Sequence, residues 1–302
     1  MVRFPTFYLN LEGPDRSGKT TVFGEIHKKT GFRWNIHDRS AISMLAFSKF
    51  YNRDDFHNIE NLKKELCNLN NRFIILYPSW ETVYERQKIA PDEIHNVVNL
   101  KRVHSLFGDI TKEFENYPNV FVVRYENPIE LIEEITNSII KTENASYKEI
   151  QQQVLLLAAA SEGEAIGVNF TLFDNGKFLG IDKEVLDYPK EKEYYEKIRE
   201  NLRNKIEKEM SEGQTKHSRR FIYSDDSCIS LANFNYRKNE LDCNIVLRSS
   251  DVVGTLYYDL NFAMILCQDV FNLLDLKPER DFCRVRFEIN SAHIPSIVNK
   301  EK

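Results

Sequence analysis

Residues 13–20 carry the pattern of a phosphate-binding loop. They read Gly-Pro-Asp-Arg-Ser-Gly-Lys-Thr, which satisfies G-x-x-x-x-G-K-[ST]. Glycines let backbone amides turn toward phosphate oxygens, and a helix beginning near Gly18 would add its positive N-terminal dipole. Lys19 would reach the β- and γ-phosphates of ATP, and the Thr20 hydroxyl would bind Mg²⁺. The cofactor-binding residues predicted in this loop are Gly13, Asp15, Ser17, Gly18, Lys19, Thr20 and Thr21.

A second group of reactive side chains lies between residues 218 and 293. Cys228 is a potential nucleophile, and neighbouring guanidinium groups would lower the pKa of its thiol. Arginines and a serine hydroxyl could hold a dianionic phosphate, and a carboxylate such as that of Asp259 could accept from the exocyclic amine of a nucleobase. The further members of this group are Arg219, Arg220, Arg248, Ser249, Asp251 and His293.

The elements that must position these groups differ between the two halves. In the first half, apolar strands at 4–11, 72–77 and 119–124 alternate with amphipathic helices, which predicts an α/β fold with a parallel sheet. The second half has short strands and a long apolar helix at about 257–274, which predicts an α+β fold with a mostly antiparallel sheet. Turns are expected at 174–176, closing a hairpin, and at Lys238-Asn239. The stretch 141–149 is polar and lacks strong periodicity, so we expect the domain boundary there, with domains at 1–144 and 145–302.

Composition limits the classes of function. The chain has 302 residues, with 41 basic and 46 acidic side chains and a net charge of -5, which argues against a broad surface that coats nucleic acid. Five cysteines without a C-x-x-C pair predict neither a disulfide framework nor a zinc site, and four of them, Cys228 excepted, are expected in the core. The sequence contains no run of about 20 apolar residues, so no membrane-spanning helix is predicted. We therefore expect a soluble, cytoplasmic protein without a membrane partner.

The stretch LNLEGPDRSGKTT at 9–21 resembles the thymidylate kinase and deoxynucleoside monophosphate kinase family. Asp38 and Arg39 resemble the family's Asp-Arg motif, where the acid arranges Mg²⁺ and the nucleophile and the arginine holds the acceptor phosphate. Arg86 resembles a lid arginine that neutralises the transferring phosphoryl group. The resemblance implies transfer of the γ-phosphoryl group of ATP to a deoxynucleotide. Only 17 residues separate Thr20 from Asp38, which shortens the acceptor-binding segment and leaves the acceptor open.

The stretches SRRFIYS, CISLANFNYRKNELDCNIVLRSSDVVG, YYDL and NSAHI resemble thymidylate synthase and, more closely, the phage deoxycytidylate hydroxymethylases. The resemblance implies that Cys228 attacks C6 of the pyrimidine, while Asp259 binds the cytosine N3 and 4-amino edge. Methylenetetrahydrofolate would supply the one-carbon unit. The resemblance also implies that Arg248 and Ser249 bind the 5′-phosphate, and that Arg219 and Arg220 reach the phosphate bound in the partner subunit of a homodimer. Asp251 would lie near the folate ring, and His293 would contact the deoxyribose.

Three readings of the whole chain follow. In the first, a phage-type transferase, in the host cytoplasm if viral, combines a deoxynucleotide kinase with a pyrimidine C5 hydroxymethyltransferase. In the second, the C-terminal domain is an inactive pyrimidine-nucleotide-binding and dimerisation module, because Ile229 follows the cysteine in place of histidine and no match to the family's catalytic glutamate is found. In the third, the kinase acts on a hydroxymethylpyrimidine in DNA, and the C-terminal domain recognises the base.

Overall fold

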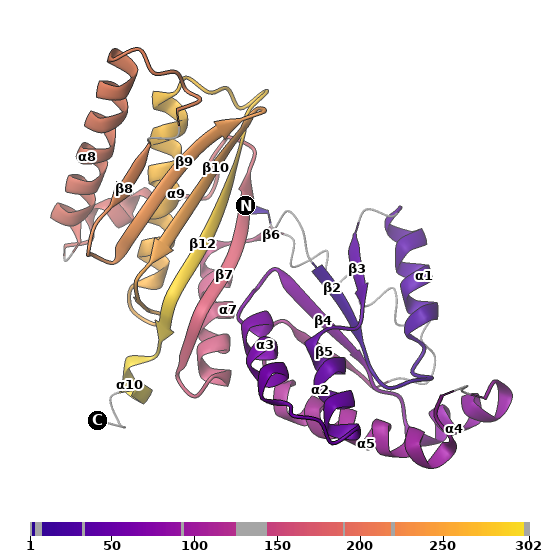
Figure 1. Cartoon of the computed structure of the whole chain (residues 1–302). Helices are drawn as coiled ribbons and strands as arrows, with labels where there is room; N and C mark the ends of the chain where they lie inside the picture. The colour runs from indigo at the N-terminus through magenta and orange to yellow at the C-terminus, as the bar shows by residue number, and fades with distance from the viewer. Residues whose placement is uncertain are drawn as a thin grey trace. The chain divides into compact units, whose positions relative to one another are not determined.

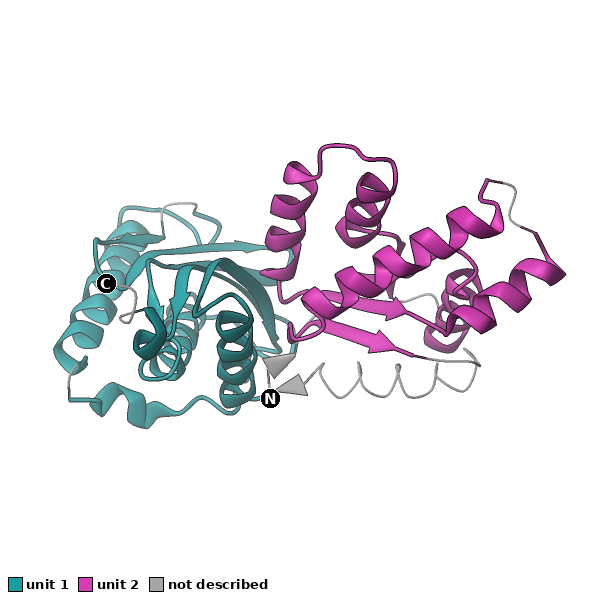
Figure 2. Cartoon of the chain, turned by 90° about the horizontal axis from the view of Figure 1, so that it is seen from below, with its two compact units in different colours: residues 1–5, 143–302 teal, residues 6–142 magenta. Residues whose placement is uncertain are grey.

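The computed structural model describes residues 2–3, 8–31, 34–91, 94–124, 144–189, 191–218 and 221–298 (Figure 1). The chain divides into two compact units (Figure 2). One unit comprises residues 6–142, and the other comprises residues 143–302 together with residues 1–5. The start of the chain, which the sequence assigned to the first domain, therefore belongs to the C-terminal unit. The reason is strand pairing, since Val2 and Arg3 form β1 between strands of that unit.

The 6–142 unit is an α/β fold around a parallel sheet with the strand order β3-β2-β4-β5. Its elements are β2 (Tyr8–Glu12), α1 (Lys19–Thr30), β3 (Asn35–Asp38), α2 (Ala41–Phe50), α3 (Phe56–Leu66), β4 (Asn71–Leu76), α4 (Trp80–Ile89), α5 (Val97–Phe114) and β5 (Val120–Val123).

Burial on both faces explains the apolar character of β4, because five of its six residues are buried. Phe73 and Ile75 pack into a core with α2, α3 and α5. Side-chain caps start three helices, as Ser40, Ser79 and Asn96 each accept from a backbone amide in the first turn of α2, α4 and α5. All four strands of the unit run parallel, so the carboxyl ends of β2 and β3 lie at one edge of the sheet.

The other unit is an α+β fold on a mixed sheet with the order β6-β1-β7-β12-β10-β9-β8. Among the described strands of this unit, only the pairs β10–β12 and β11–β12 are parallel. Its elements are β1 (Val2–Arg3), β6 (Asn144–Ala145), α7 (Tyr147–Ala160), β7 (Glu164–Asp174), η1 (Lys183–Asp187), α8 (Lys192–Ser211), β8 (Ile222–Ser224), β9 (Ile229–Arg237), β10 (Glu240–Leu247), β11 (Ser250–Asp251), α9 (Leu256–Leu273), β12 (Phe282–His293) and α10 (Pro295–Val298).

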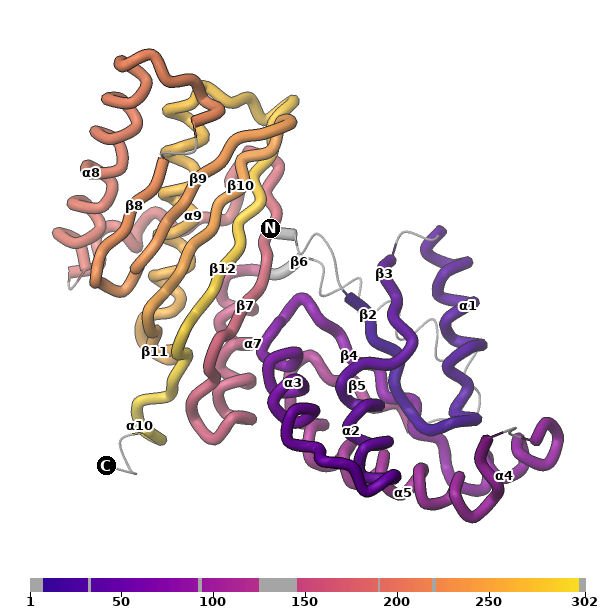
Figure 3. Tube along the Cα trace, viewed as in Figure 1, coloured from indigo at the N-terminus to yellow at the C-terminus, as the bar shows by residue number. Residues whose placement is uncertain are grey.

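The core of this unit lies on one face of the sheet. Buried residues alternate along β10 and face α9, which is itself buried over most of its length. Helices α7 and α8 pack against α9 on that same side (Figure 3). The two sheets thus confirm the predicted parallel and mostly antiparallel arrangements.

The two predicted turns have different outcomes. Lys238 and Asn239 adopt φ of 49° and 65° and close a two-residue hairpin between β9 and β10, as predicted. The hairpin predicted at 174–176 was wrong, because β7 ends at Asp174 and no described strand follows before β8. The Asp174 carboxylate instead accepts from the backbone amide of Phe178 at 2.8 Å, which bends the chain toward η1. In the described part of the chain, no helix is long and apolar enough to cross a membrane.

Candidate functional site

The phosphate-loop sequence connects the end of β2 to the start of α1. Gly13 has φ of 135°, and a Cβ there would lie 2.3 Å from the carbonyl oxygen of Leu76. Gly18 has φ of 99° and precedes the first helical residue, Lys19. Both glycines are therefore required by the backbone, since a side chain would clash at Gly13 and be strained at either position. The amides at the start of α1 are left to face a ligand.

Lys19 lies at the base of this loop. Its Nζ donates to the carbonyl oxygens of Gly13 at 2.7 Å and Pro14 at 2.9 Å, and only 8% of the residue is exposed. Burial, and then the charge of Arg39, lower the pKa of Lys19 to about 8. The ammonium group is thus held inside the loop by two neutral acceptors, where an anion would be a stronger partner.

A pocket of about 690 Å³ opens beside the loop. It is lined by three arginines, Arg16, Arg39 and Arg86, together with Lys19 and the carboxylates Asp15 and Asp38. Arg39 pairs with Asp15 at 2.6 Å, and Arg86 donates to the carbonyl oxygen of Arg16 at 2.9 Å. The remaining lining comes from Ser17, Gly18, Thr20, Thr21, Ile89, Ala90, Pro91 and Ile94. Of the residues predicted in this half, only Gly13 is not in the lining.

Asp38 and Arg39 reach the pocket because β3 pairs with β2. The register places Asp38 opposite Leu11, and the amide of Arg39 donates to the Leu11 carbonyl oxygen at 3.1 Å. Arg39 adopts φ of 77° and lies with its guanidinium 4.8 Å from the ring centroid of Phe47. The Asp-Arg pair is therefore fixed by sheet pairing at one end and by a cation–π contact at the other.

Glu12 is a functional residue for which no separate role was predicted. It is fully buried at the end of β2, and its carboxylate accepts from the Ser40 amide and from the hydroxyls of Ser40 and Ser43. Burial raises the pKa of Glu12, while these donors oppose the shift. The carboxylate therefore joins the start of the phosphate loop to the first turn of α2, and so holds the Asp38-Arg39 turn in place. A charged residue ending an apolar strand was the available signal.

The second site is built around Cys228, just before β9. Its thiol donates to the carbonyl oxygen of Ser249 at 3.1 Å and lies 3.7 Å from Oδ2 of Asp259. Asp259 is 3% exposed in the first turn of α9, and Oδ2 also accepts from the Ser250 hydroxyl at 2.9 Å. The Cys228 thiol, the Asp259 carboxyl group, the Ser249 carbonyl oxygen and the Ser250 hydroxyl thus meet at one point.

The pKa expected for the thiol was wrong in direction. Burial, and then Asp259, raise the pKa of Cys228 to about 12, and the opposing effect of Arg248 is smaller. Burial also raises the pKa of Asp259 to about 7. The reason is that the lowering effect of the Arg248 guanidinium is weaker than the effect of burial, which disfavours both charged forms. In the absence of a ligand the thiol is therefore neutral at pH 7.

Other predicted residues surround this centre. Arg248 is exposed, and its Nη1 donates to the carbonyl oxygen of Asp226 at 2.8 Å. Asp251 accepts from the amides of Val253 and Gly254, so its carboxylate shapes the loop that leads into α9. His293 lies opposite Asp251 in the β11–β12 pairing. Arg219 and Arg220 lie outside the described residues.

The start of α8 contributes residues that sequence reasoning missed. The Tyr194 hydroxyl contacts Ser227 Oγ at 2.9 Å and accepts from the Ile229 amide at 2.9 Å, so it braces both sides of Cys228. Glu191 caps α8, and its charge acts on both Cys228 and Asp259. The Tyr194-Tyr195 pair in an otherwise charged segment was a usable signal in the sequence.

Comparison with solved structures gives partial likenesses. Two structures of deoxyadenosine kinase from M. mycoides, one with dATP and one with the products dCMP and a flexible dCDP, are 18% and 17% identical and have TM-scores of 0.33 and 0.34. They cover 44% and 45% of this chain and 99% and 100% of their own. Thymidylate synthase from T4 phage is 22% identical over 31% of this chain and 34% of its own, with a TM-score of 0.25. No family model and no curated protein matches the chain. These likenesses do not assign it to a family.

Proposed function

We propose that the 6–142 unit is an ATP- and Mg²⁺-dependent phosphotransferase that acts on a deoxynucleotide. The observation that carries the proposal is the position of Lys19 under a glycine-containing loop, in a pocket that three arginines also line. A triphosphate needs this density of donors and positive charge, and a neutral metabolite does not. The pocket also offers oxygen ligands in Thr20, Asp15 and Asp38, which are the ligands that Mg²⁺ prefers.

The proposed roles follow from these positions. Backbone amides of the loop and Lys19 hold the β- and γ-phosphates, and the Thr20 hydroxyl with a carboxylate such as Asp38 would hold Mg²⁺, which neutralises phosphate charge. Arg39 orients the acceptor, and Arg86 and Arg16 stabilise negative charge on the transferring group. The bond from the γ-phosphorus to the bridging oxygen of ATP breaks as the bond to the acceptor oxygen forms. Where the acceptor is a hydroxyl, Asp38 would accept its proton, and Asp15, which also lines the pocket, would be the carboxylate near Mg²⁺.

The test is an acceptor screen combined with a lysine substitution. ATP turnover would be measured with each deoxynucleoside monophosphate and with DNA that contains hydroxymethylpyrimidine. We expect one acceptor to stimulate turnover and Lys19→Ala to reduce it by about 100-fold or more, the scale seen when one charge-stabilising donor is removed. Lys28→Ala is the matched control, because Lys28 lies exposed on the same helix and forms an ion pair with Glu25 outside the pocket lining. Full activity in Lys19→Ala would refute the proposal.

For the C-terminal unit we propose a pyrimidine deoxynucleotide site. The support is the Cys228–Asp259 contact beside Ser249 and Arg248, which puts a nucleophile and a base-binding acid near donors for a 5′-phosphate. An aspartic acid with a pKa of about 7 carries a proton for much of the time at neutral pH. It could therefore donate to N3 of cytosine and accept from the 4-amino group.

Two activities are compatible with this site. In C5 hydroxymethyl transfer, Cys228 would lose its proton and add to C6. C5 would then take the methylene carbon from methylenetetrahydrofolate and lose its own proton, the carbon–nitrogen bond to the folate would break, water would supply the hydroxyl group, and the thiolate would leave C6. Glu191 is the nearby carboxylate that could accept a proton during this chemistry. In the alternative, the site binds the nucleotide without chemistry, which the neutral thiol favours.

Tritium release from [5-³H]-dCMP separates the two, measured with and without the folate and alongside dCMP binding. Release that is lost in Cys228→Ala and kept in Cys67→Ala supports catalysis, because Cys67 lies in the other unit. Binding without release supports the inactive module. If the protein neither binds dCMP nor releases tritium, the proposed nucleotide site is rejected.

We also propose that the chain is a homodimer through its C-terminal unit. The sheet face opposite α9 carries the half-exposed pairs Arg284–Glu240 and Arg286–Asp242 and has no described helix packed on it. Light scattering of the purified chain tests this directly, and a monomer at micromolar concentration would contradict it.

A further inference from the structure

Three cysteines converge inside the C-terminal unit. Cys243 lies on β10, Cys267 on α9 and Cys283 on β12, and all three are fully buried. Their sulfur atoms lie within 4.8 Å of one another, and those of Cys243 and Cys283 are 3.7 Å apart. None of these residues belongs to the proposed nucleotide sites. The sequence separates them by 24 and 16 residues, so only the fold brings the thiols together.

Strand register argues against a disulfide as the purpose of this cluster. Cys243 pairs with Val285, and Cys283 pairs with Leu241, so the two cysteines are diagonal neighbours on adjacent strands. Diagonal Cα atoms are about 7–8 Å apart, and the upper limit for an unstrained disulfide is about 7 Å. Cys267 approaches from the helix above the sheet rather than from a third strand. The arrangement is therefore three sulfurs around one point.

A buried hydroxyl supplies a second, independent observation. Tyr147 on α7 is 3% exposed, and its hydroxyl has no hydrogen-bond partner among the described residues. Its phenol interacts electrostatically with the thiols of Cys267 and Cys283. Buried polar atoms are almost always paired, so an unpaired hydroxyl that interacts with two of the three thiols indicates a further partner such as an ion or a water.

We propose that Cys243, Cys267 and Cys283 bind one Zn²⁺ ion, with the Tyr147 hydroxyl facing the fourth position. A tetrahedral zinc with Zn–S bonds of about 2.3 Å has S···S edges of about 3.8 Å, close to the 3.7 Å between Cys243 and Cys283. Three thiolates leave a net charge of -1 with Zn²⁺ and -2 with Cu⁺, and an apolar site favours the smaller charge. Binding releases the thiol protons to solvent.

Such an ion would stabilise the packing of α9 on the sheet. It would join α9 to two neighbouring strands, and α9 also carries Asp259, eight residues before Cys267. The site would therefore stabilise the helix on which the base-binding acid sits. This role does not depend on whether the C-terminal unit catalyses a reaction.

The test uses the full chain under reducing conditions, with Cd²⁺ as a spectroscopic probe and Zn²⁺ as its competitor. Because the sulfurs are buried, the ion is added both to folded protein and during refolding. We expect one Cd²⁺ per chain, a near-ultraviolet thiolate-to-metal charge-transfer band, displacement by Zn²⁺, and a higher melting temperature with Zn²⁺. Cys243→Ala and Cys283→Ala should lose the band, whereas the matched controls Cys67→Ala and Cys228→Ala should keep it.

Failure to observe a stoichiometric band, or a band that survives in Cys283→Ala or disappears in Cys67→Ala, would overturn the proposal. If the alanine variants do not fold, proton release from wild-type protein in weak buffer decides the question. We expect about two protons per bound ion at pH 7. Burial raises the pKa values of Cys243 and Cys283, whereas for Cys267 burial is outweighed by hydrogen bonds from these two thiols, which lower its pKa to about 6. Release of one proton or fewer would reject a three-thiolate site.

Discussion

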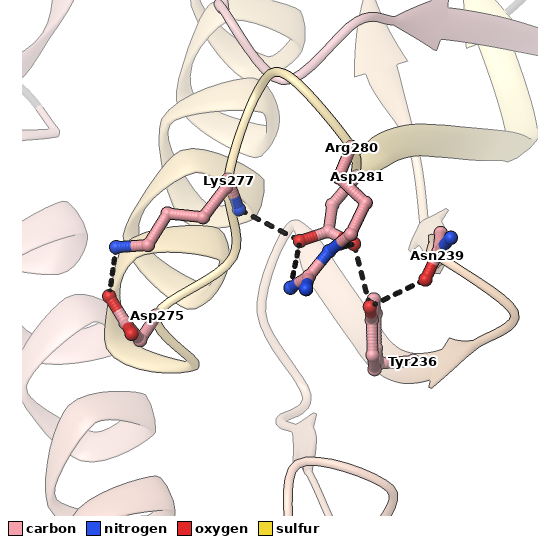
Figure 4. A network of polar contacts seen from close by, with 6 residues as sticks. All are labelled: Tyr236, Asn239, Asp275, Lys277, Arg280 and Asp281. Atoms are coloured by element: carbon pink, nitrogen blue, oxygen red, sulfur yellow. Dashed lines mark hydrogen bonds and ion pairs between the residues drawn. The ribbon is translucent and has the colours of Figure 1, made fainter.

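Two buried aspartates at opposite ends of β9 differ sharply in charge. Asp259 lies beside Cys228, which precedes the strand, and burial raises its pKa to about 7. Asp281 contacts Tyr236 near the other end, and although burial opposes ionisation, hydrogen bonds from Arg280, the Lys277 amide and Tyr236 lower its pKa to about 2 (Figure 4). Their exposed fractions, 3% and 1%, are nearly the same.

The difference lies in the donors. Asp259 receives the hydroxyls of Ser250 and Thr255 and the thiol of Cys228, all neutral, and Glu191 adds a negative charge nearby. Asp281 receives a guanidinium, an amide and a phenol. Burial alone therefore does not mark a reactive acid, and the set of partners decides whether a buried carboxyl is a fixed anion or a group that can exchange a proton.

The largest expected effect is that of Asp259→Asn, which tests whether Asp259 is protonated in the folded protein. A folded-state pKa near 7, above the ordinary 3.8, means that the native protein holds a proton that the unfolded chain releases. Stability should therefore fall as pH rises from about 4 to 7, by roughly 4 kcal/mol, and the asparagine variant should lose this slope. Urea unfolding at several pH values measures it. Asp269→Asn, on the same helix but paired with Arg199, should keep the slope; an unchanged slope in Asp259→Asn would contradict the assignment.

Asp281→Asn tests the other side of the comparison. Loss of the charged hydrogen bonds should lower the free energy of unfolding at pH 7 by about 2 kcal/mol. Because the folded pKa is below the ordinary value, wild-type stability from this group is present above about pH 4 and is lost as pH falls toward 2. The variant should lack that acid-side loss. Asp275→Asn is the matched control, since Asp275 is exposed and forms an ion pair with the exposed Lys277 (Figure 4). Equal losses in both variants would contradict the network's importance.

Lys19 extends the comparison to a buried base. Its pKa of about 8 should rise when phosphates bind, so ATP binding should take up a proton above about pH 8 and weaken by about tenfold per pH unit there. Calorimetry in buffers of different ionisation enthalpy measures the uptake. Lys19→Arg stays charged and should show none. Equal proton uptake in the two proteins would assign the titration to another group.

The smallest expected effect concerns a partly exposed pair. Arg39 and Asp15 have side-chain exposures of 38% and 16%, so solvent screens their attraction. Asp15→Asn should change the free energy of unfolding by about 0.5 kcal/mol, and the difference should shrink further in high salt. A loss above about 2 kcal/mol would show that this pair behaves like Asp281 rather than like a surface contact.

Sequence patterns that extend over a few residues predicted the features that depend on neighbouring residues. The G-x-x-x-x-G-K-T spacing and the alternation of strands and helices predicted the parallel sheet and the loop at its edge, because glycine geometry and periodicity act over a few residues. The cysteine cluster could not be predicted, since its members come from three elements and no spacing rule applies. The direction of the Cys228 pKa was missed because the sequence shows nearby arginines but not how deeply the thiol is buried. The role of Glu12 could not be predicted either, because its serine partners lie 28 and 31 residues away in the sequence.

Strand β1 has a consequence for the order in which the chain can assemble. Val2 and Arg3 pair with Asn144–Ala145 and with Phe173, so the 6–142 unit is an insertion within the first strands of the other unit. During synthesis the inserted unit can fold alone, while the first residues must wait until more than half of the chain has been made. A clone that starts at residue 143 would lack β1 and leave β7 with an open edge. The two units are therefore better separated by removing the insertion than by cutting the chain in two.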